Sequence, residues 1–302
     1  MKTLHTTENI TWVHLTDPTP LEIQEISDEH QIHLRTAEEL LSANITSKVD
    51  LFDNYLYIAL RFPTIEKTTV REFEIDCVLT PNALISVSYE EIPAISNLEH
   101  SVEANAVLKN QPLGDHAGYL FYFLIARLYE TVGQSLIVSE RQLDRLEAEV
   151  FAGNHREMVR ELSEISRALV DTNQSLANHR AVLPALEAAG EELFGESFQY
   201  RLHRIHGEYQ RVVDKIAQLK ETLNELRHTN DSLLTTRQNE VMKTFTIMAF
   251  LTFPLSLVSS IFGMNTQNMP LVGHPQGFWI IVSSMIGLVI LALFYFRYKK
   301  WI

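Results

Sequence analysis

The sequence predicts an α/β cytosolic domain followed by a long helical stalk and two transmembrane helices. Short β-rich runs alternate with helical stretches up to about residue 92, a nearly continuous helical pattern follows, and two apolar segments lie near the carboxyl end. We therefore expect three parts in the 302-residue chain. They are an α/β part at 1–92, a helical part with the stalk at 93–240, and a two-helix membrane unit at 241–302.

The α/β part contains four β-rich runs separated by turn residues such as Asp17-Pro18 and Thr80-Pro81-Asn82. Helical patterns begin near Leu21 and Thr36. The predicted strands are 10–15, 55–62, 73–79 and 83–88.

Three helices are expected next, at 115–151, 156–189 and 196–262. The third has no proline before Pro254 and would be about 100 Å long, far beyond the usual globular length. A helix of that length needs lateral packing in water. Apolar residues at three- and four-residue spacing supply one packing stripe, and this spacing fits an intrachain bundle as well as an oligomer: Leu202, Ile205, Tyr209, Val212, Ile216, Leu219, Leu223 and Leu226.

The two apolar segments, 244–262 and 278–296, are each long enough to cross a bilayer as a helix. The loop between them, 263–277, has no Lys or Arg. By the positive-inside rule both termini are cytoplasmic, the loop faces outward, and a multi-pass inner (plasma) membrane protein is expected. The basic residues flank only the outer ends of the pair: Arg237, Lys243, Arg297, Lys299 and Lys300.

Composition narrows the class of protein. The net charge of the chain is −13, and the membrane unit carries several basic residues, so the acid excess lies in the cytosolic part. There it disfavours nucleic acid and attracts cations, although many soluble domains are equally acidic. The single cysteine, Cys77, excludes an internal disulfide and suits a reducing compartment. The first nine residues are polar and do not resemble a signal peptide. No P-loop and no base beside a nucleophile can be identified, so we do not expect an enzyme.

Five landmarks near the carboxyl end occur in a characteristic order: Asn239-Glu240-Val241-Met242-Lys243, Pro254, Phe262-Gly263-Met264-Asn265, Met269-Pro270 and Lys299-Lys300-Trp301-Ile302. Their order and spacing resemble the CorA family of divalent metal-ion transporters, which includes a zinc-transporting ZntB branch. The motif match covers roughly the last 65 residues, with weaker likeness near 48–60 and 84–87. The resemblance implies a funnel-shaped homopentamer that transports Mg²⁺ and is also regulated by it.

A pore is expected along one face of the first membrane helix. Two helices cannot enclose an aqueous path, so several copies must surround it. Small and hydroxyl residues often mark helix packing instead, but the resemblance implies that this face lines the pore: Asn239, Met242, Thr246, Ala249, Phe253, Ser256 and Ser260. Met242, Phe245 and Phe253 are the expected gate. The two phenylalanines stand where relatives commonly carry aliphatic or methionine side chains.

The selectivity site is expected at Gly263-Met264-Asn265. Neither membrane segment contains Asp, Glu or His, and Mg²⁺ gives up its water reluctantly. The Asn265 amide and the carbonyls of Gly263 and Met264 would therefore contact a hydrated dication, with Co²⁺ and Ni²⁺ passing as similar ions. The alternative is a plain helix cap with Gly or Asn in left-handed geometry. Two charges moving inward gain about 4.6 kcal/mol per 100 mV, so uptake can be passive.

Two further functions were considered. The outer loop has no acid and contains His274, which suits a Zn²⁺ or Ni²⁺ ligand and hence a ZntB-like Zn²⁺ importer, with or without proton coupling. A membrane-anchored scaffold that transports nothing is the other alternative. Regulatory Mg²⁺ would bind acids of the cytosolic domain, for which the candidates are Glu38, Glu39, Asp76, Glu90 and Glu91.

Overall fold

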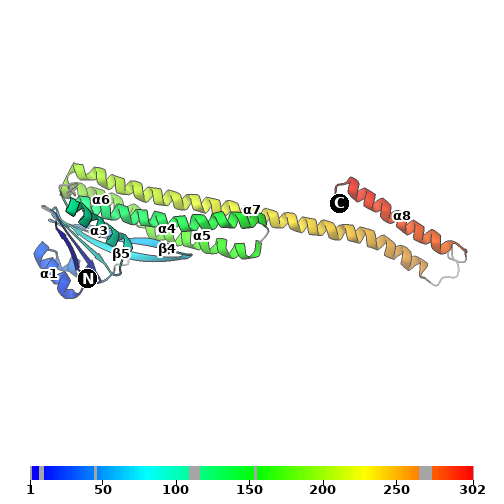
Figure 1. Cartoon of the computed structure of the whole chain (residues 1–302), viewed down its shortest axis with the longest axis horizontal. Helices are drawn as coiled ribbons and strands as arrows, with labels where there is room; N and C mark the ends of the chain where they lie inside the picture. Colours follow the sequence, from blue (N-terminus) through cyan, green and yellow to red (C-terminus); the bar gives the residue numbers. More distant parts are fainter. Residues whose placement is uncertain are drawn as a thin grey trace. The chain divides into compact units, whose positions relative to one another are not determined.

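A computed structural model describes residues 2–6, 10–43, 46–108, 116–152, 155–264 and 274–301. The chain forms two compact units, Met1–Arg227 and His228–Ile302. The first is a sheet with helices on both faces, and the second contains the carboxyl-terminal part of a long helix and one further helix (Figure 1).

The sheet of the first unit has six strands in the order β1-β2-β6-β5-β4-β3. Strands β2 and β6 pair in parallel and the other neighbours pair antiparallel. The strands are β1 Lys2–Thr6, β2 Thr11–Thr16, β3 Lys48–Leu51, β4 Leu56–Glu66, β5 Thr69–Leu79 and β6 Ala83–Ser88. The four predicted strands are confirmed. The two that were missed, β1 and β3, are short, partly polar edge strands, which lack the apolar run that marks a central strand.

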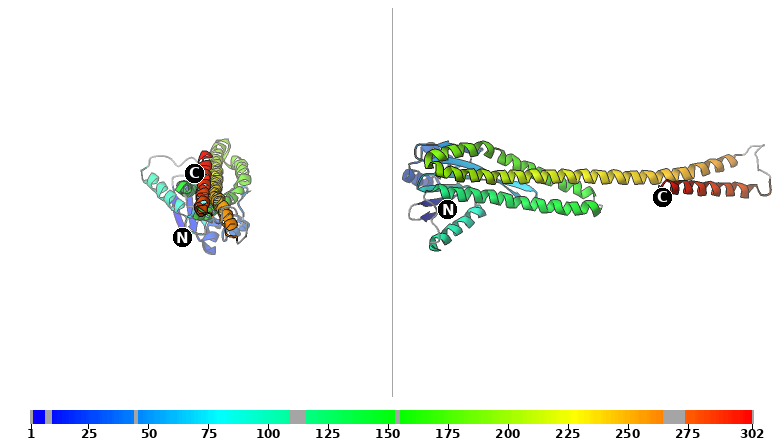
Figure 2. Two further views of the ribbon diagram at one scale, coloured as in Figure 1. Left: turned by 90° about the vertical axis from the view of Figure 1, so that its right-hand side faces the viewer. Right: turned by 90° about the horizontal axis from the view of Figure 1, so that it is seen from above.

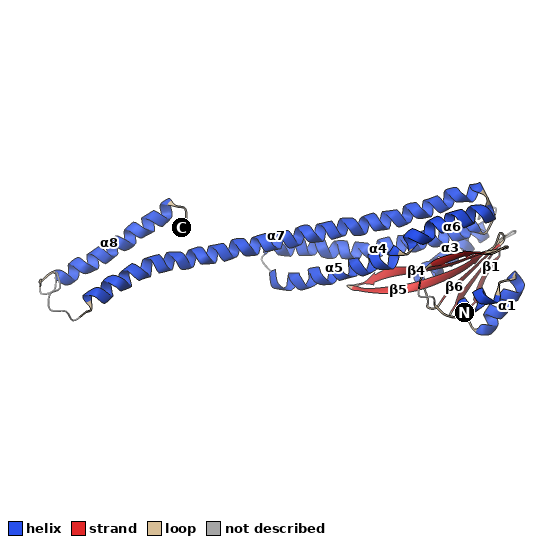
Figure 3. Cartoon of the chain, turned by 180° about the vertical axis from the view of Figure 1, so that it is seen from behind, coloured by secondary structure: helices blue, strands red, loops and turns tan. Residues whose placement is uncertain are grey.

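One face of the sheet is covered by α1 (Pro20–His30) and α2 (Leu34–Glu39). Thr19 starts α1 through a capping box with Glu22, which satisfies free N–H groups of the first turn. Ile23 and Ile26 then pack on the sheet beside Val13, Val78 and other apolar side chains. Figure 3 shows the sheet between α1 on one side and α4 and α6 on the other.

The remaining helices of this unit are α3 (Pro93–Leu108), α4 (Gly118–Ala152), α5 (His155–Ala177) and α6 (His179–Phe194). Helices α4, α5 and α6 contact β4. The prediction of a single helix at 156–189 is wrong, because a turn at Asn178 separates α5 from α6. The buried His179 side chain bonds across to β4 at this turn, and Pro184 inside α6 removes one helical N–H donor.

Helix α7 runs from Glu196 to Phe262 without interruption, as predicted (Figure 2). All eight residues of its predicted stripe, from Leu202 to Leu226, are buried within this single chain. The intrachain alternative therefore accounts for the stripe, and an oligomer has to be argued from the second unit. That unit ends with α8 (Gly277–Tyr298), which follows the described part of α7 as a second apolar helix.

Candidate pore and ion site

Two helices of the chain, α7 and α8, are long and apolar enough to cross a membrane. Their apolar side chains are exposed in the single chain, with Phe253 73%, Leu291 73% and Phe294 75% accessible. Apolar area of this extent is unfavourable in water and indicates lipid or further protein around it. The second unit is therefore the membrane-spanning part.

Helix α8 packs against α7 at a defined point. The Phe250 ring of α7 meets the Phe296 ring of α8 edge to face, with centroids 6.1 Å apart, and Phe296 also stacks on Trp301. At the same end, Lys243 Nζ donates a hydrogen bond of 3.4 Å to the carbonyl oxygen of Lys300. Phe250 therefore lies on the side of α7 that contacts the second membrane helix.

The expected pore face of α7 is not covered by α8 where its members are largest. Met242 is 62% exposed and Phe253 73%, while Asn239, Ser256 and Ser260 are also exposed and Thr246 and Ala249 are half-buried. The Thr246 hydroxyl donates to the carbonyl of Met242 at 2.8 Å, so its oxygen lone pairs remain available. Phe245, the third residue of the expected gate, is 63% exposed.

Gly263 follows the last turn of α7. Its N–H donates to the Ser259 carbonyl at 2.9 Å, and the Met264 N–H donates to the Ile261 carbonyl at 3.2 Å. The left-handed geometry considered for this glycine is wrong, because the positive-φ glycine of the described chain is Gly195. A Cβ atom at Gly263 would lie 3.1 Å from the Ser259 carbonyl oxygen, which is a tight contact. Asn265 lies outside the described residues.

His274 is exposed and lies just before α8. Its Nδ1 accepts a hydrogen bond of 3.3 Å from the Gln276 N–H, and its carbonyl accepts one of 2.9 Å from the Gly277 N–H. These bonds satisfy N–H groups at the start of the helix. A neutral imidazole that accepts at Nδ1 carries its proton on Nε2, so Nε2 can bind a metal ion only after the proton moves to Nδ1 and the bond from Gln276 is lost. Across the described residues, no three His, Cys, Asp or Glu side chains converge on a metal position.

The acids considered for regulatory Mg²⁺ do not share one environment. Glu38 and Glu91 are exposed, Glu39 pairs with Lys48, and Glu90 lies 3.3 Å from Arg71. Asp76 is fully buried in the sheet, so it cannot reach another copy of the chain from this position. Burial raises the pKa of Asp76 to about 8, and this carboxyl is therefore mostly protonated at neutral pH.

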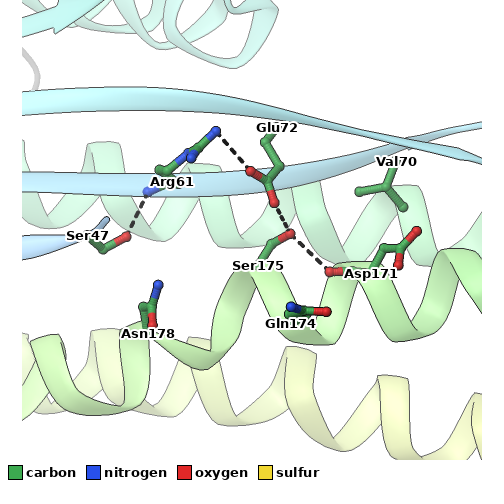
Figure 4. A pocket seen from close by; sticks show the side chains of 8 residues that line it. All are labelled: Ser47, Arg61, Val70, Glu72, Asp171, Gln174, Ser175 and Asn178. Atoms are coloured by element: carbon green, nitrogen blue, oxygen red, sulfur yellow. Dashed lines mark hydrogen bonds and ion pairs between the residues drawn. The ribbon is translucent and has the colours of Figure 1, made fainter. Parts of the chain in front are cut away.

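A polar cavity of about 390 Å³ lies between β4, β5 and α5 (Figure 4). Arg61 and Glu72 form an ion pair of 2.9 Å there, and the Ser175 hydroxyl donates to Glu72. Asp171 lines the same cavity, and its backbone carbonyl accepts a hydrogen bond of 3.0 Å from the Ser175 hydroxyl. The Arg61 backbone N–H donates to Ser47 at 3.1 Å. No local sequence pattern marks this cluster, because its members come from three separate elements.

With this geometry described, the chain can be compared with known proteins. The model of the family described as CorA-like Mg²⁺ transporter protein matches residues 7–300. The chain belongs to this family. The cobalt/magnesium transport protein CorA of Thermotoga maritima is 25% identical over 97% of this chain and 82% of its own length. That of Methanocaldococcus jannaschii is 22% identical over 96% of this chain and 91% of its own.

Solved structures agree on the fold. The complete CorA magnesium transporter from Methanocaldococcus jannaschii superposes with a TM-score of 0.83 at 21% identity, covering 99% of this chain and 94% of that one. Full-length CmaX gives 0.70 at 19% identity over 99% and 91%. The ZntB cytoplasmic domain from Vibrio parahaemolyticus gives 0.54 at 17% identity over 77% and 90%. The CorA family membership and the fold class predicted from the sequence are thereby confirmed.

Proposed function

We propose that the chain carries hydrated divalent cations, principally Mg²⁺, into the cell through a pore surrounded by five copies of α7. The observation that carries this proposal is the face of α7 that stays open after α8 has packed at Phe250. That face combines hydroxyl, amide and small side chains with a single bulky ring, Phe253. Other copies of the chain would cover it and enclose a path that one chain cannot.

The ion would stay hydrated in this pore. Residues 244–262 and 278–296 contain no Asp, Glu or His, so neither segment offers a side chain that could replace the water of Mg²⁺. Gly263, Met264 and Asn265 would hold the hydrated ion at the outer mouth, where amide and carbonyl oxygens accept hydrogen bonds from its water. Met242, Phe245 and Phe253 would form the gate. Both termini would lie in the cytoplasm, with the chain in the inner (plasma) membrane.

The membrane potential is the proposed driving force, because two positive charges gain about 4.6 kcal/mol per 100 mV. The test uses liposomes with a clamped potential and an internal Mg²⁺ dye. Uptake should increase with an inside-negative potential and should not change with a pH gradient. Uptake that follows the pH gradient and ignores the potential would contradict the passive pore.

A second candidate is Zn²⁺ import. It is favoured by His274, an exposed imidazole that would bind Zn²⁺ through Nε2 once its proton moves to Nδ1 and the hydrogen bond from Gln276 is lost. A single imidazole is a transient ligand and not a structural Zn²⁺ site. Direct comparison of Mg²⁺ and Zn²⁺ uptake in the same liposomes separates the two candidates.

A further inference from the structure

Two acidic side chains, Glu74 and Asp76, are buried in the first unit on one face of β5. Side chains two positions apart on a strand point the same way. In the sheet register, Asp76 lies opposite Ala59 and Glu74 opposite Arg61. Asp76 is 0% and Glu74 5% exposed. Two carboxyl groups at this depth are rare in proteins and need a physical explanation.

The two carboxyl oxygens of Asp76 differ in their hydrogen bonds. The Tyr89 hydroxyl donates to Oδ2 at 2.6 Å, and the same hydroxyl lies 3.3 Å from the carbonyl oxygen of Glu39. Oδ1 is buried and has no hydrogen-bond partner in the part of the chain that the structure describes. An ionised carboxylate accepts hydrogen bonds at both oxygens, so this setting strongly disfavours the charged form.

The nearest lysine is held elsewhere. Lys48 shares a row of the sheet with Asp76, separated from it by Ala59, and two strand spacings amount to about 10 Å. Its ammonium group pairs with Glu39, lies 3.3 Å from Asp50 Oδ2, and is 5.0 Å from the centre of the Tyr57 ring. Lys48 therefore neutralises carboxylates other than Asp76.

Arg61 lies opposite Glu74 in the sheet register and also has a carboxylate partner outside the pair. Arg61 Nη2 lies 2.9 Å from Glu72 Oε2. Around the site, more carboxyl groups than cations thus share one patch of the sheet. The titratable and charged groups that face it come from each neighbouring element: Glu39 of α2, Lys48 and Asp50 of β3, Tyr57 and Arg61 of β4, Glu72 and Glu74 of β5, and Tyr89 after β6.

We propose that Glu74 and Asp76 form a binding site for one small cation and that its occupant is a proton, held on the Asp76 carboxyl. The proton removes the negative charge that an ionised Asp76 would place in the sheet, while Lys48 pairs with other carboxylates. Burial raises the pKa of Asp76 to about 8 and the charge of Glu74 adds to this, while the hydrogen bond from Tyr89 opposes it. The site therefore releases its proton in a physiological pH range.

The proton links pH to folding. The folded pKa of Asp76 is above the ordinary value of 3.8, so the folded chain holds one proton more than the unfolded chain between about pH 4 and pH 8. The contribution of this proton to the free energy of unfolding is fully present below about pH 4. It declines as the pH rises through the window, and none of it remains above about pH 8. The unfolding equilibrium constant should rise about tenfold per pH unit inside the window.

Infrared difference spectroscopy of the full-length chain in lipid nanodiscs tests the occupant directly. Raising the pH from about 7 to about 9 should remove one protonated-carboxyl C=O band, because this range spans the pKa of about 8. Asp76→Asn keeps the size of the side chain and should lack that band at both values. Asp50→Asn, a matched change at an exposed acid beside Lys48, should retain it. A band that survives in Asp76→Asn would overturn the assignment.

Two further measurements test whether the occupant is a proton or a metal ion, and whether the charge of Glu74 affects the titration of Asp76. Adding Mg²⁺ at pH 7 should leave the band unchanged, and its loss on Mg²⁺ addition would show a metal site instead. Glu74→Gln should move the titration to lower pH, because the like charge beside Asp76 is gone. An unshifted titration would contradict the pair. Neither readout involves transport, so the outcome is independent of the proposed function.

Discussion

The ring of Phe250 in α7 stands edge to face against the ring of Phe296 in α8, with centroids 6.1 Å apart and planes at 82°. This contact fixes the side of α7 that its own chain covers. Phe253, one turn further on, remains 73% exposed. The two phenylalanines therefore have different roles in the proposed pore, one in packing between helices and one at the gate.

Substitution of Phe253 by alanine should raise Mg²⁺ flux into liposomes. Five Phe253 rings would form a constriction too apolar for a hydrated dication, and truncation would widen and wet it. The same change should have little effect on the stability of the single-chain fold, because the side chain is mostly exposed there. Mg²⁺ flux and thermal unfolding should be measured on the same preparation of Phe253→Ala, so that the change in flux and the change in stability can be compared.

Phe250→Ala is the matched control for that experiment. It deletes the same side chain from the same helix but removes the ring contact with Phe296, which is worth about 1 kcal/mol. Stability should fall and flux should not rise. Reduced or unchanged flux in Phe253→Ala together with a large loss of stability would mean that Phe253 is a packing residue.

A homopentamer should be seen when the detergent-solubilised protein is analysed by native mass spectrometry. The reason is the exposed face of α7, which needs other copies to cover it and to enclose a path. The buried stripe from Leu202 to Leu226 does not supply this argument, since its own chain covers it. Spectra with monomers or dimers alone would refute the pore arrangement.

His179 should make stability fall at low pH. Its Nε2–H donates to the Arg61 carbonyl at 2.9 Å, and its Nδ1 accepts from the Tyr129 hydroxyl at 2.7 Å. Burial lowers the pKa of His179 to about 4, against the effect of the bond to Arg61. A histidine with a lowered pKa stabilises the folded chain at a pH above its ordinary pKa of 6.5. This stabilisation, about 3 kcal/mol in total, is lost as the pH falls towards 4.

The measurement for His179 is the difference in unfolding free energy between the wild-type chain and His179→Gln. The glutamine amide can still donate to the Arg61 carbonyl but does not titrate. Taking the difference cancels the opposite slope expected from Asp76 and the titration of surface acids. The difference should shrink from about pH 6.5 to about pH 4. A difference that is independent of pH would show that His179 does not titrate in this range.

His274→Ala should leave Mg²⁺ uptake unchanged and should lower Zn²⁺ uptake only if the imidazole binds Zn²⁺ during entry. Its Nδ1 accepts from the Gln276 N–H at 3.3 Å, so His274→Asn, whose side chain can still accept that bond, separates helix capping from metal binding. Under the Mg²⁺ proposal both variants transport Mg²⁺ at the wild-type rate. A selective loss of Mg²⁺ uptake in His274→Ala would point to a role that the proposal does not include.

Sequence alone predicted the elements whose pattern is local. The apolar membrane segments, the unbroken helix to Phe262 and the four central strands all have strong periodicity or composition. Other features depend on distant contacts and could not be seen. The break at Asn178 coincides with His179 reaching Arg61, which is 118 positions away in the chain. Of the buried acid pair, the sequence suggested Asp76 only as a candidate ligand of regulatory Mg²⁺ and Glu74 was missed, although their two-residue spacing in a strand already placed them on one face.

Asn265→Ala tests the central claim most directly, through Mg²⁺ uptake into liposomes under an inside-negative potential. The amide is proposed to bind the hydrated ion at the outer mouth and to contribute little to packing. We predict that uptake is abolished while native mass spectrometry still shows the wild-type assembly. Normal Mg²⁺ uptake by an intact Asn265→Ala assembly would contradict the account.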